Sequence, residues 1–217
     1  MKSKAIILLA SVLLFSSCII KSIQPFYLKN SLSYNKALIG KWADQKGGQW
    51  EVISMKEEFI KDKKEGLIFS DDDKKAYENY KDGYFINYIK KEKEVSFIAM
   101  PFIIDNQYFV DFIPFDINTD AINSLASEHL LKTHSVAKLD VNSDTNVSFS
   151  WLSEERIKNL FNESTLRLKH ETVGPEEALL LTASSQELTA FLKKYLKADI
   201  KDKWKSSDAL MLVKEII

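Results

Sequence analysis

Apolar and polar residues alternate most regularly between residues 134 and 151. Leu139 and Val141 flank Asp140, and a second alternating run follows residues 142–144, which have turn composition. A period of two residues is typical of a strand with one buried and one solvated face. The pattern therefore predicts an antiparallel hairpin with one wet face.

Two earlier runs, residues 95–104 and 108–115, are apolar on both alternating faces. In the first run, Val95, Phe97, Ala99 and Ile103 alternate with Ile98, Met100, Phe102 and Ile104. Asp105-Asn106-Gln107 between the runs has the composition of a tight hairpin connection. Such strands are either buried on both sides, or they line an apolar cavity and are covered outside by helices.

Shorter runs predict the remaining elements. Strands are expected at residues 49–56, 66–69, 83–89, 166–170, 178–182 and 209–216, and a short helix or ordered loop at residues 118–132. Helices are expected at 153–162, which opens with a hydroxyl cap and an acidic first turn, and at 184–196, where Ser184 and Glu187 have capping-box spacing. The second helix carries the most regular apolar stripe in the chain.

Eight or nine strands in antiparallel order with two good helices fit two architectures. One is a closed barrel, which leaves no sheet edge open, and the other is an open antiparallel sheet with helices on one face. The barrel is favoured, because closure of the sheet removes its edges, and we expect it as a single β-rich domain over residues 37–217.

The start of this domain supports the barrel. Gly40-Lys41-Trp42 resembles the lipocalin and wider calycin signature, in which the tryptophan plugs one end of the barrel and the glycine allows close backbone approach. The resemblance implies that Gly40 and Trp42 form a barrel end. The chain departs from the pattern because it has no Thr-Asp-Tyr motif and no late arginine to stack on the tryptophan, although Lys214 could substitute. An ordinary core tryptophan on an ordinary strand is the alternative.

The first residues form a different kind of segment. Lys2 and Lys4 precede an apolar run, Ala5–Phe15, which is too short to span a bilayer and is typical of a secretory signal peptide. Small residues then stand before Cys18, the only cysteine of the chain.

This arrangement resembles the bacterial lipoprotein signal, although Phe15 replaces the commoner leucine. The resemblance implies that residues 1–17 are removed, that Cys18 carries fatty acyl chains, and that residues 18–36 form a tether. Two or three acyl chains are enough for stable membrane anchoring. The alternative is a simple secretory peptide with a chance cysteine.

The lipoprotein resemblance also predicts a location. Some lipoproteins of the Bacteroidota type carry an acidic run just after the cysteine as a signal for export to the cell surface. Here the first acidic residue after Cys18 is Asp44. We therefore expect a lipid-anchored envelope protein, on the periplasmic face of the outer membrane.

Composition argues against several functions. Thirty basic residues face 31 acidic ones, which gives no basic footprint for nucleic acid. No Gly-x-Ser-x-Gly nucleophile motif or glycine-rich phosphate loop occurs, so the sequence predicts no catalytic residue and no cofactor.

The chain offers no convincing metal site either. His129 and His134 are five residues apart, which is not a zinc spacing on a helix, and His170 alternates with leucines as a core histidine would. The run Asp71-Asp72-Asp73 fails the EF-hand pattern, because Ala76 stands where a glycine is needed. Asp111 and Asp116 are carboxylates that no spacing singles out.

Three functional hypotheses remain, and none of them assigns a ligand-binding residue. The first is a binding module that holds a small apolar ligand inside the barrel, with the aromatic residues between Tyr84 and Phe115 as its wall. The second is a structural or interaction lipoprotein that has a packed interior and contacts another envelope protein. The third is an unrecognised envelope hydrolase.

We predict that Cys18 is the site of acylation. Cells fed radiolabelled palmitate should label the wild-type protein and not the Cys18→Ser variant. Ser17→Ala keeps a small residue before the cysteine and should retain the label. A Cys18→Ser protein that is labelled as strongly as wild type would contradict the assignment.

Overall fold

The computed structural model describes residues 19–117, 130–204 and 209–215. The barrel strands are β2 (Gly40–Asp44), β3 (Gln49–Ser54), β4 (Tyr84–Lys90), β5 (Lys93–Ile104), β6 (Gln107–Ile117), β7 (His134–Ser143), β8 (Asn146–Trp151) and β11 (Leu210–Lys214). Outside them lie β1 (Lys21–Ser22), β9 (His170–Val173), β10 (Ala178–Leu181), α2 (Met55–Lys64), α3 (Asp71–Tyr80), α5 (Glu154–Asn162) and α6 (Ser185–Lys197). Two 3-10 turns, η1 (Lys29–Ser31) and η2 (Lys36–Leu38), precede β2.

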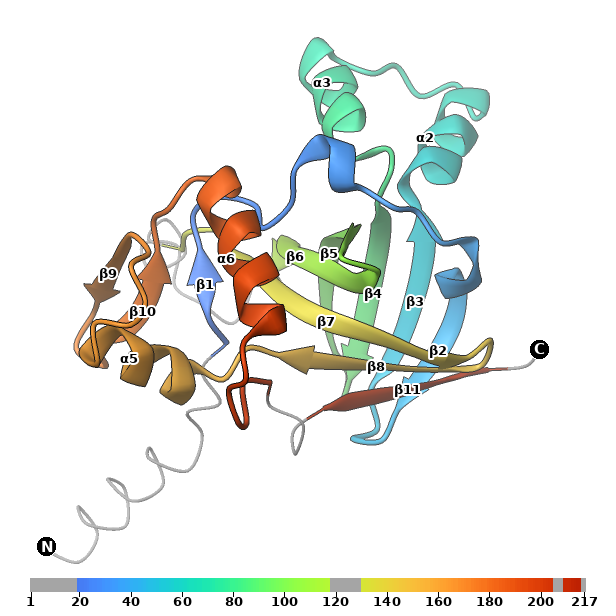
Figure 1. The fold of residues 1–217 in the computed structure, drawn as a ribbon. Helices are drawn as coiled ribbons and strands as arrows, with labels where there is room; N and C mark the ends of the chain where they lie inside the picture. Colours follow the sequence, from blue (N-terminus) through green and yellow to red (C-terminus); the bar gives the residue numbers. More distant parts are fainter. Residues whose placement is uncertain (1–18, 118–129, 205–208, 216–217) are drawn as a thin grey trace, which may run out of the picture.

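The chain forms a closed antiparallel barrel of eight strands (Figure 1). Its strand order is β6-β5-β4-β3-β2-β11-β8-β7, and β7 pairs with β6 to close the ring. The mainly β, calycin-like barrel predicted from the sequence is confirmed, and the open-sheet alternative is excluded.

The hairpin between β5 and β6 has the geometry that its turn residues favour. Asp105 and Asn106 both have positive φ, 47° and 66°, and Ile104 pairs directly with Gln107. Asp and Asn tolerate this left-handed conformation better than most residues, and its twist matches that of the flanking strands. The predicted hairpin is therefore confirmed, although its turn contains only Asp105 and Asn106 and Gln107 already belongs to β6.

The inward faces of the strands form the barrel core. It contains Leu38, Trp42, Trp50, Val52, Tyr84, Ile86, Ala99, Val110, Phe112, Ala137, Leu139, Val147, Phe149, Leu210 and Leu212. Trp42 is 1% exposed, and its Nε1 donates to the carbonyl of Leu38 at 2.9 Å. This bond holds Trp42 against Leu38, the last residue of η2, just before β2 begins.

Gly40 and Lys214 complete the surroundings of Trp42. Lys214 Nζ lies 5.1 Å from the centroid of the Trp42 ring and donates to the carbonyl of Ala37. A cation over an aromatic face is attracted by the ring quadrupole. Gly40 has a φ of 129°, and a Cβ there would lie 3.0 Å from Lys214 Cε. Lys214 thus packs on the Trp42 ring, in the place that the sequence signature gives to an arginine, as expected.

A second apolar core covers the outside of β5, β6 and β7. Ile98, Met100, Phe102 and Ile104 point outward from β5, whereas Ala99 points into the barrel. Residues of β10, α5, α6 and the N-terminal segment complete this outer core: Ile20, Phe26, Tyr27, Ile157, Leu179, Leu181, Leu188, Phe191, Leu192 and Tyr195. Both faces of β5 are therefore buried, as its sequence predicted.

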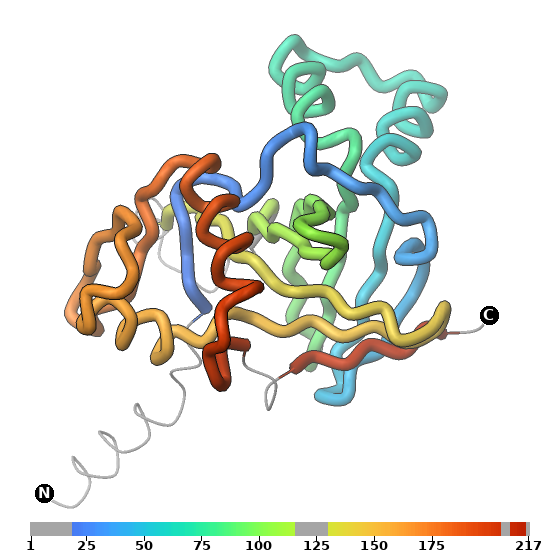
Figure 2. Tube along the Cα trace, viewed as in Figure 1, coloured from blue at the N-terminus to red at the C-terminus, as the bar shows by residue number. Residues whose placement is uncertain are grey.

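Residues 19–36 are part of the fold, which corrects the free tether predicted for residues 18–36. β1 pairs with both β7 and β10, and Ile20, Phe26 and Tyr27 are buried in the outer core. In Figure 2 this segment crosses from the outer layer to the barrel strand β2. The segment is packed because the outer face of β5 and β6 needs an apolar cover.

Helices α2 and α3 correct another part of the prediction. Residues 66–69 were expected to form a strand, but they connect these two helices, which project from the barrel between β3 and β4 (Figure 1). Asp71-Asp72-Asp73 forms the first turn of α3, where Ser70 and Asp73 make a capping box. Neither helix has a buried residue, so their weak apolar pattern gave no helical signal.

The later elements agree with the sequence. The hairpin β7–β8, the helices α5 and α6, and the strands β10 and β11 occur where they were predicted, and Ser184 and Glu187 form the expected capping box. The predicted strand at residues 166–170 begins only at His170. Of the helix or loop expected at 118–132, residues 118–129 lie outside the described residues.

We predict that Trp42→Ala lowers the free energy of unfolding by about 3–5 kcal/mol, as truncation of a large core side chain does. Guanidinium denaturation measures this loss. Lys41→Ala, at the exposed neighbour on β2, should change the value by no more than about 0.5 kcal/mol. A loss below about 1 kcal/mol for Trp42→Ala would contradict the packing described.

Candidate functional site

The barrel interior is filled by its own side chains. A cavity of only about 20 Å³ remains, lined by residues that include Trp42, Trp50, Tyr84 and Phe149. That volume is close to the space one water needs, while sites for drug-sized ligands start at about 300 Å³. Of the aromatic wall predicted between Tyr84 and Phe115, Tyr84 and Phe112 face the packed barrel interior, Phe102 and Phe109 face the outer core, and Phe115 is exposed.

A much larger groove lies outside the barrel, between α6 and the segment that links α5 to β9. Its volume is about 470 Å³. Its apolar lining comes from Leu160, Leu166, Leu168, Phe191, Tyr195 and Ile200. We refer to this site as the α6 groove, and its volume and apolar surface are typical of small-molecule sites.

The floor of the α6 groove is buried and uncharged. Phe191 and Tyr195 are both buried in the outer core, and their rings lie 5.2 Å apart. The Tyr195 hydroxyl donates to the carbonyl of Lys203. Burial raises the pKa of Tyr195 above its ordinary value, so this phenol stays neutral at physiological pH.

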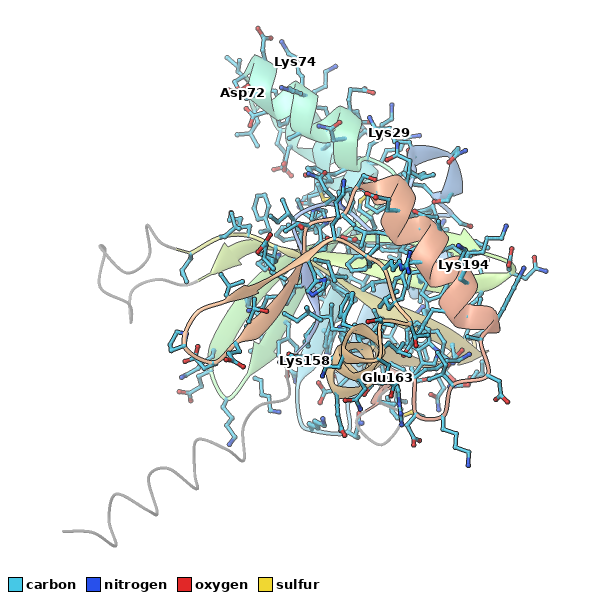
Figure 3. The ribbon with its side chains drawn as sticks, turned by 60° about the vertical axis from the view of Figure 1, so that its left-hand side comes forward. Lys29, Asp72, Lys74, Lys158, Glu163 and Lys194 are labelled. Carbon is cyan, nitrogen blue, oxygen red and sulfur yellow. The ribbon has the colours of Figure 1, made fainter. Side chains whose placement is uncertain are left out.

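The rim of the groove carries charge. The lining of the groove includes Arg167, Glu187 and Lys194, and all three residues are exposed. Figure 3 labels Lys194 on α6, with Lys158 on α5 and Glu163 directly after the last residue of α5. Glu187 is held at the start of α6, where its Oε2 accepts from the backbone N–H and the hydroxyl of Ser184.

A buried carboxylate lies elsewhere in the outer core. Asp111 on β6 is fully buried, and its Oδ1 is 2.7 Å from Nδ1 of His134 on β7. Its Oδ2 accepts from the backbone N–H of Phe26 at 2.8 Å. Asp111 thus joins two barrel strands to the N-terminal segment. Burial raises the pKa of Asp111 above its ordinary value, although the bonds to His134 and Phe26 oppose the shift.

This pair has the acid and imidazole of a catalytic triad but is not joined to a nucleophile in the described part of the chain. Ser22 pairs with His134 across β1 and β7, yet its hydroxyl is buried and donates to the carbonyl of Leu181. We therefore interpret Asp111 and His134 as a clamp on the N-terminal segment. The sequence did not single out this pair, because the two residues are 23 positions apart.

The other residues considered from the sequence lie apart. His170 is exposed, not in the core as predicted, because β9 is the outermost strand; its ring stacks on Phe161. Gly40 and Trp42 lie in the barrel, away from the α6 groove. Cys18, His129 and the side chain of Asp116 lie outside the described residues.

The described ranges contain no cluster of three or more histidine, cysteine or acidic residues suited to a metal ion. Within the same ranges, no helix is long and apolar enough to cross a membrane. Comparisons with protein-family models, curated proteins and solved structures found no match. A functional assignment therefore depends on the geometry of the sites themselves.

The sequence contained part of the signal for the α6 groove. The apolar stripe of α6 was predicted, but the sequence did not indicate which of its residues would line a groove. Phe191 and Tyr195 pack inward and also face the groove, a double role that periodicity does not reveal.

We predict that Asp111→Ala costs about 3–5 kcal/mol of stability, because it leaves His134 and the Phe26 N–H without their partner. Asp111→Asn should cost much less, since its amide oxygen can accept from the Phe26 N–H and its NH2 group can donate to a ring nitrogen of His134. Because the pKa of Asp111 is raised in the folded state, its favourable contribution exists at low pH and is lost as the pH rises through that pKa.

The stability of Asp111→Asn relative to wild type should therefore increase as the pH rises above about 4, the unfolded value. Chemical denaturation at a series of pH values measures this difference. A difference that decreases with pH would contradict the assignment.

Proposed function

We propose that this chain is a lipid-anchored envelope protein that binds a small apolar group in the α6 groove and uses its barrel as a scaffold. A closed β-barrel fits ligand binding in general. Two observations carry the proposal: the contrast between about 20 Å³ inside the barrel and about 470 Å³ in the groove, and the apolar floor of the groove, which a surface hollow of about 450 Å³ lined mostly by charged residues of α2 lacks. The sequence predicted a ligand inside the barrel, and we now propose that the ligand binds outside it, in the α6 groove.

The membrane part of the proposal rests on the signal sequence that ends at Cys18. The charged start, the short apolar run and the small residues before a lone cysteine support acylation. The periplasmic face of the outer membrane remains the proposed location, because no acidic run follows the cysteine. We propose no catalytic role and no nucleic-acid partner.

A second candidate is contact with another envelope protein through the tip between α2 and α3. Ile68 is 96% exposed there and Leu67 is 56% exposed, whereas Phe59 stacks on Phe69 and Tyr77 to hold the two helices together. Large apolar side chains at such exposure are typical of interaction sites when they gather in a patch. This candidate corresponds to the interaction lipoprotein considered from the sequence.

We predict that native mass spectrometry of the full chain, extracted from its host membrane, will show a retained small apolar molecule. Ala190→Phe should abolish this retention, because Ala190 lines the groove and its exposed position tolerates a larger side chain. Gln186→Phe introduces the same ring at an exposed position of α6 outside the groove lining and should keep the molecule.

Two outcomes would contradict the proposal. One is a wild-type protein without any bound molecule, together with an envelope protein that crosslinks at Ile68, which would favour the second candidate. The other is a molecule that Ala190→Phe still retains.

A further inference from the structure

The charges around the α6 groove indicate what kind of group it binds. This inference depends on the proposed function and concerns the chemistry of the occupant. Apolar side chains form the floor and walls, and two cations, Arg167 and Lys194, stand on the rim. An occupant complementary to both features has an apolar chain and an anionic head group.

Lys194 differs from Lys193, Lys197 and Lys203 in the contacts of its ammonium group. Lys193 and Lys197 both pair with Asp105, at 3.4 Å and 2.7 Å. Lys203 donates to the carbonyls of Tyr195, Leu196 and Ala198 and so satisfies the C-terminal end of α6. Each of these ammonium groups already has protein partners.

By contrast, Lys194 Nζ makes no ion pair or hydrogen bond with any residue that the structure describes, and the guanidinium of Arg167 makes none either. Both side chains line the groove. Guanidinium and ammonium groups on an apolar site provide a counter-charge for a carboxylate or a phosphate.

Glu187 gives the groove a direction. It is seven residues before Lys194, which is about 10 Å along a helix. Ser184 holds its carboxylate at the start of α6, and this interaction lowers the pKa of Glu187 below its ordinary value. The carboxylate of Glu187, whose charge Lys169 partly offsets, therefore disfavours a negative head group at the start of α6, whereas Lys194 attracts one further along the helix.

We propose that the α6 groove binds a single-chain anionic amphiphile, a free fatty acid, with its tail against Phe191 and Tyr195 and its carboxylate at Lys194 and Arg167. The groove volume of about 470 Å³ lies within the range of small-molecule sites. Phosphate alone would contact the two cations but leave the apolar floor exposed to water. An uncharged apolar molecule would contact the floor but leave the two cations without a counter-charge.

Photolabelling tests this chemistry in the full chain, kept in its membrane. The probes are a twelve-carbon fatty acid with a diazirine at the chain end and the matching alcohol. Labelled peptides are identified by mass spectrometry, and half-saturating concentrations are measured for each probe. Both probes should label peptides within residues 160–168 and 187–200, and the acid should saturate at the lower concentration.

Lys194→Met keeps an unbranched side chain only one atom shorter and removes its charge. It should raise the half-saturating concentration of the acid about two- to fivefold, the effect of one exposed ion pair, and leave the alcohol unchanged. The double variant with Arg167→Met should raise it about tenfold. Lys193→Met removes the same charge one residue away, outside the groove, and should change neither probe. Lys194→Arg should restore the acid preference.

The outcomes separate this inference from the proposed function. If both probes label the groove equally and Lys194→Met affects neither, the groove binds apolar groups but the anionic head group is wrong. If neither probe labels these peptides, the proposed function fails as well. Labelling by a diacyl phosphatidylglycerol probe that Lys194→Met weakens, without any labelling by the fatty acid, would also overturn the inference.

Discussion

The fold depends on β5 and β6 being apolar on both faces. Ala99, Val110 and Phe112 fill the barrel, whereas Met100, Phe102 and Phe109 point outward and are fully buried. Burial of such side chains contributes about 1.5–3 kcal/mol each, so the three outward ones alone account for about 5–9 kcal/mol. This is comparable to the whole stability of a typical domain. The barrel therefore requires its outer cover, and α6, β10 and the N-terminal segment provide it.

How much the sequence predicted depends on which interactions specify each element. Local signals predicted the β5–β6 hairpin, through Asp105 and Asn106, and the capped helix α6, through Ser184 and Glu187. Non-local packing decided the rest. Residues 19–36 have no periodicity of their own and are ordered by the apolar face they cover, through Phe26 and Asp111. Helices α2 and α3 bury no side chain, so no apolar stripe marked them. Of the candidate site, only the stripe of α6 was predictable, because the groove forms where α6 meets the distant segment 165–168.

The packed interior and the outer layer together explain where a ligand site is available. Eight-stranded barrels are narrow, and here Trp42, Trp50, Tyr84 and Phe149 fill the space that larger barrels leave for a ligand. The outer layer packs less completely at its rim, where the segment after α5 approaches α6. The apolar residues that line the groove thus also belong to the layer that covers the barrel. A ligand there would contact Phe191 and Tyr195, which belong to the outer core, so we expect its binding to stabilise that layer.

The central claim is that an apolar ligand binds outside the barrel. Intermolecular NOEs between dodecanoate and selectively labelled methyl groups of the full chain in lipid nanodiscs test it most directly. We expect NOEs to the methyl groups of Leu166, Leu168 and Ala190, which line the groove, and none to Val52, Ile86 and Val110 in the barrel core. NOEs to the methyl groups of the barrel core would contradict the account.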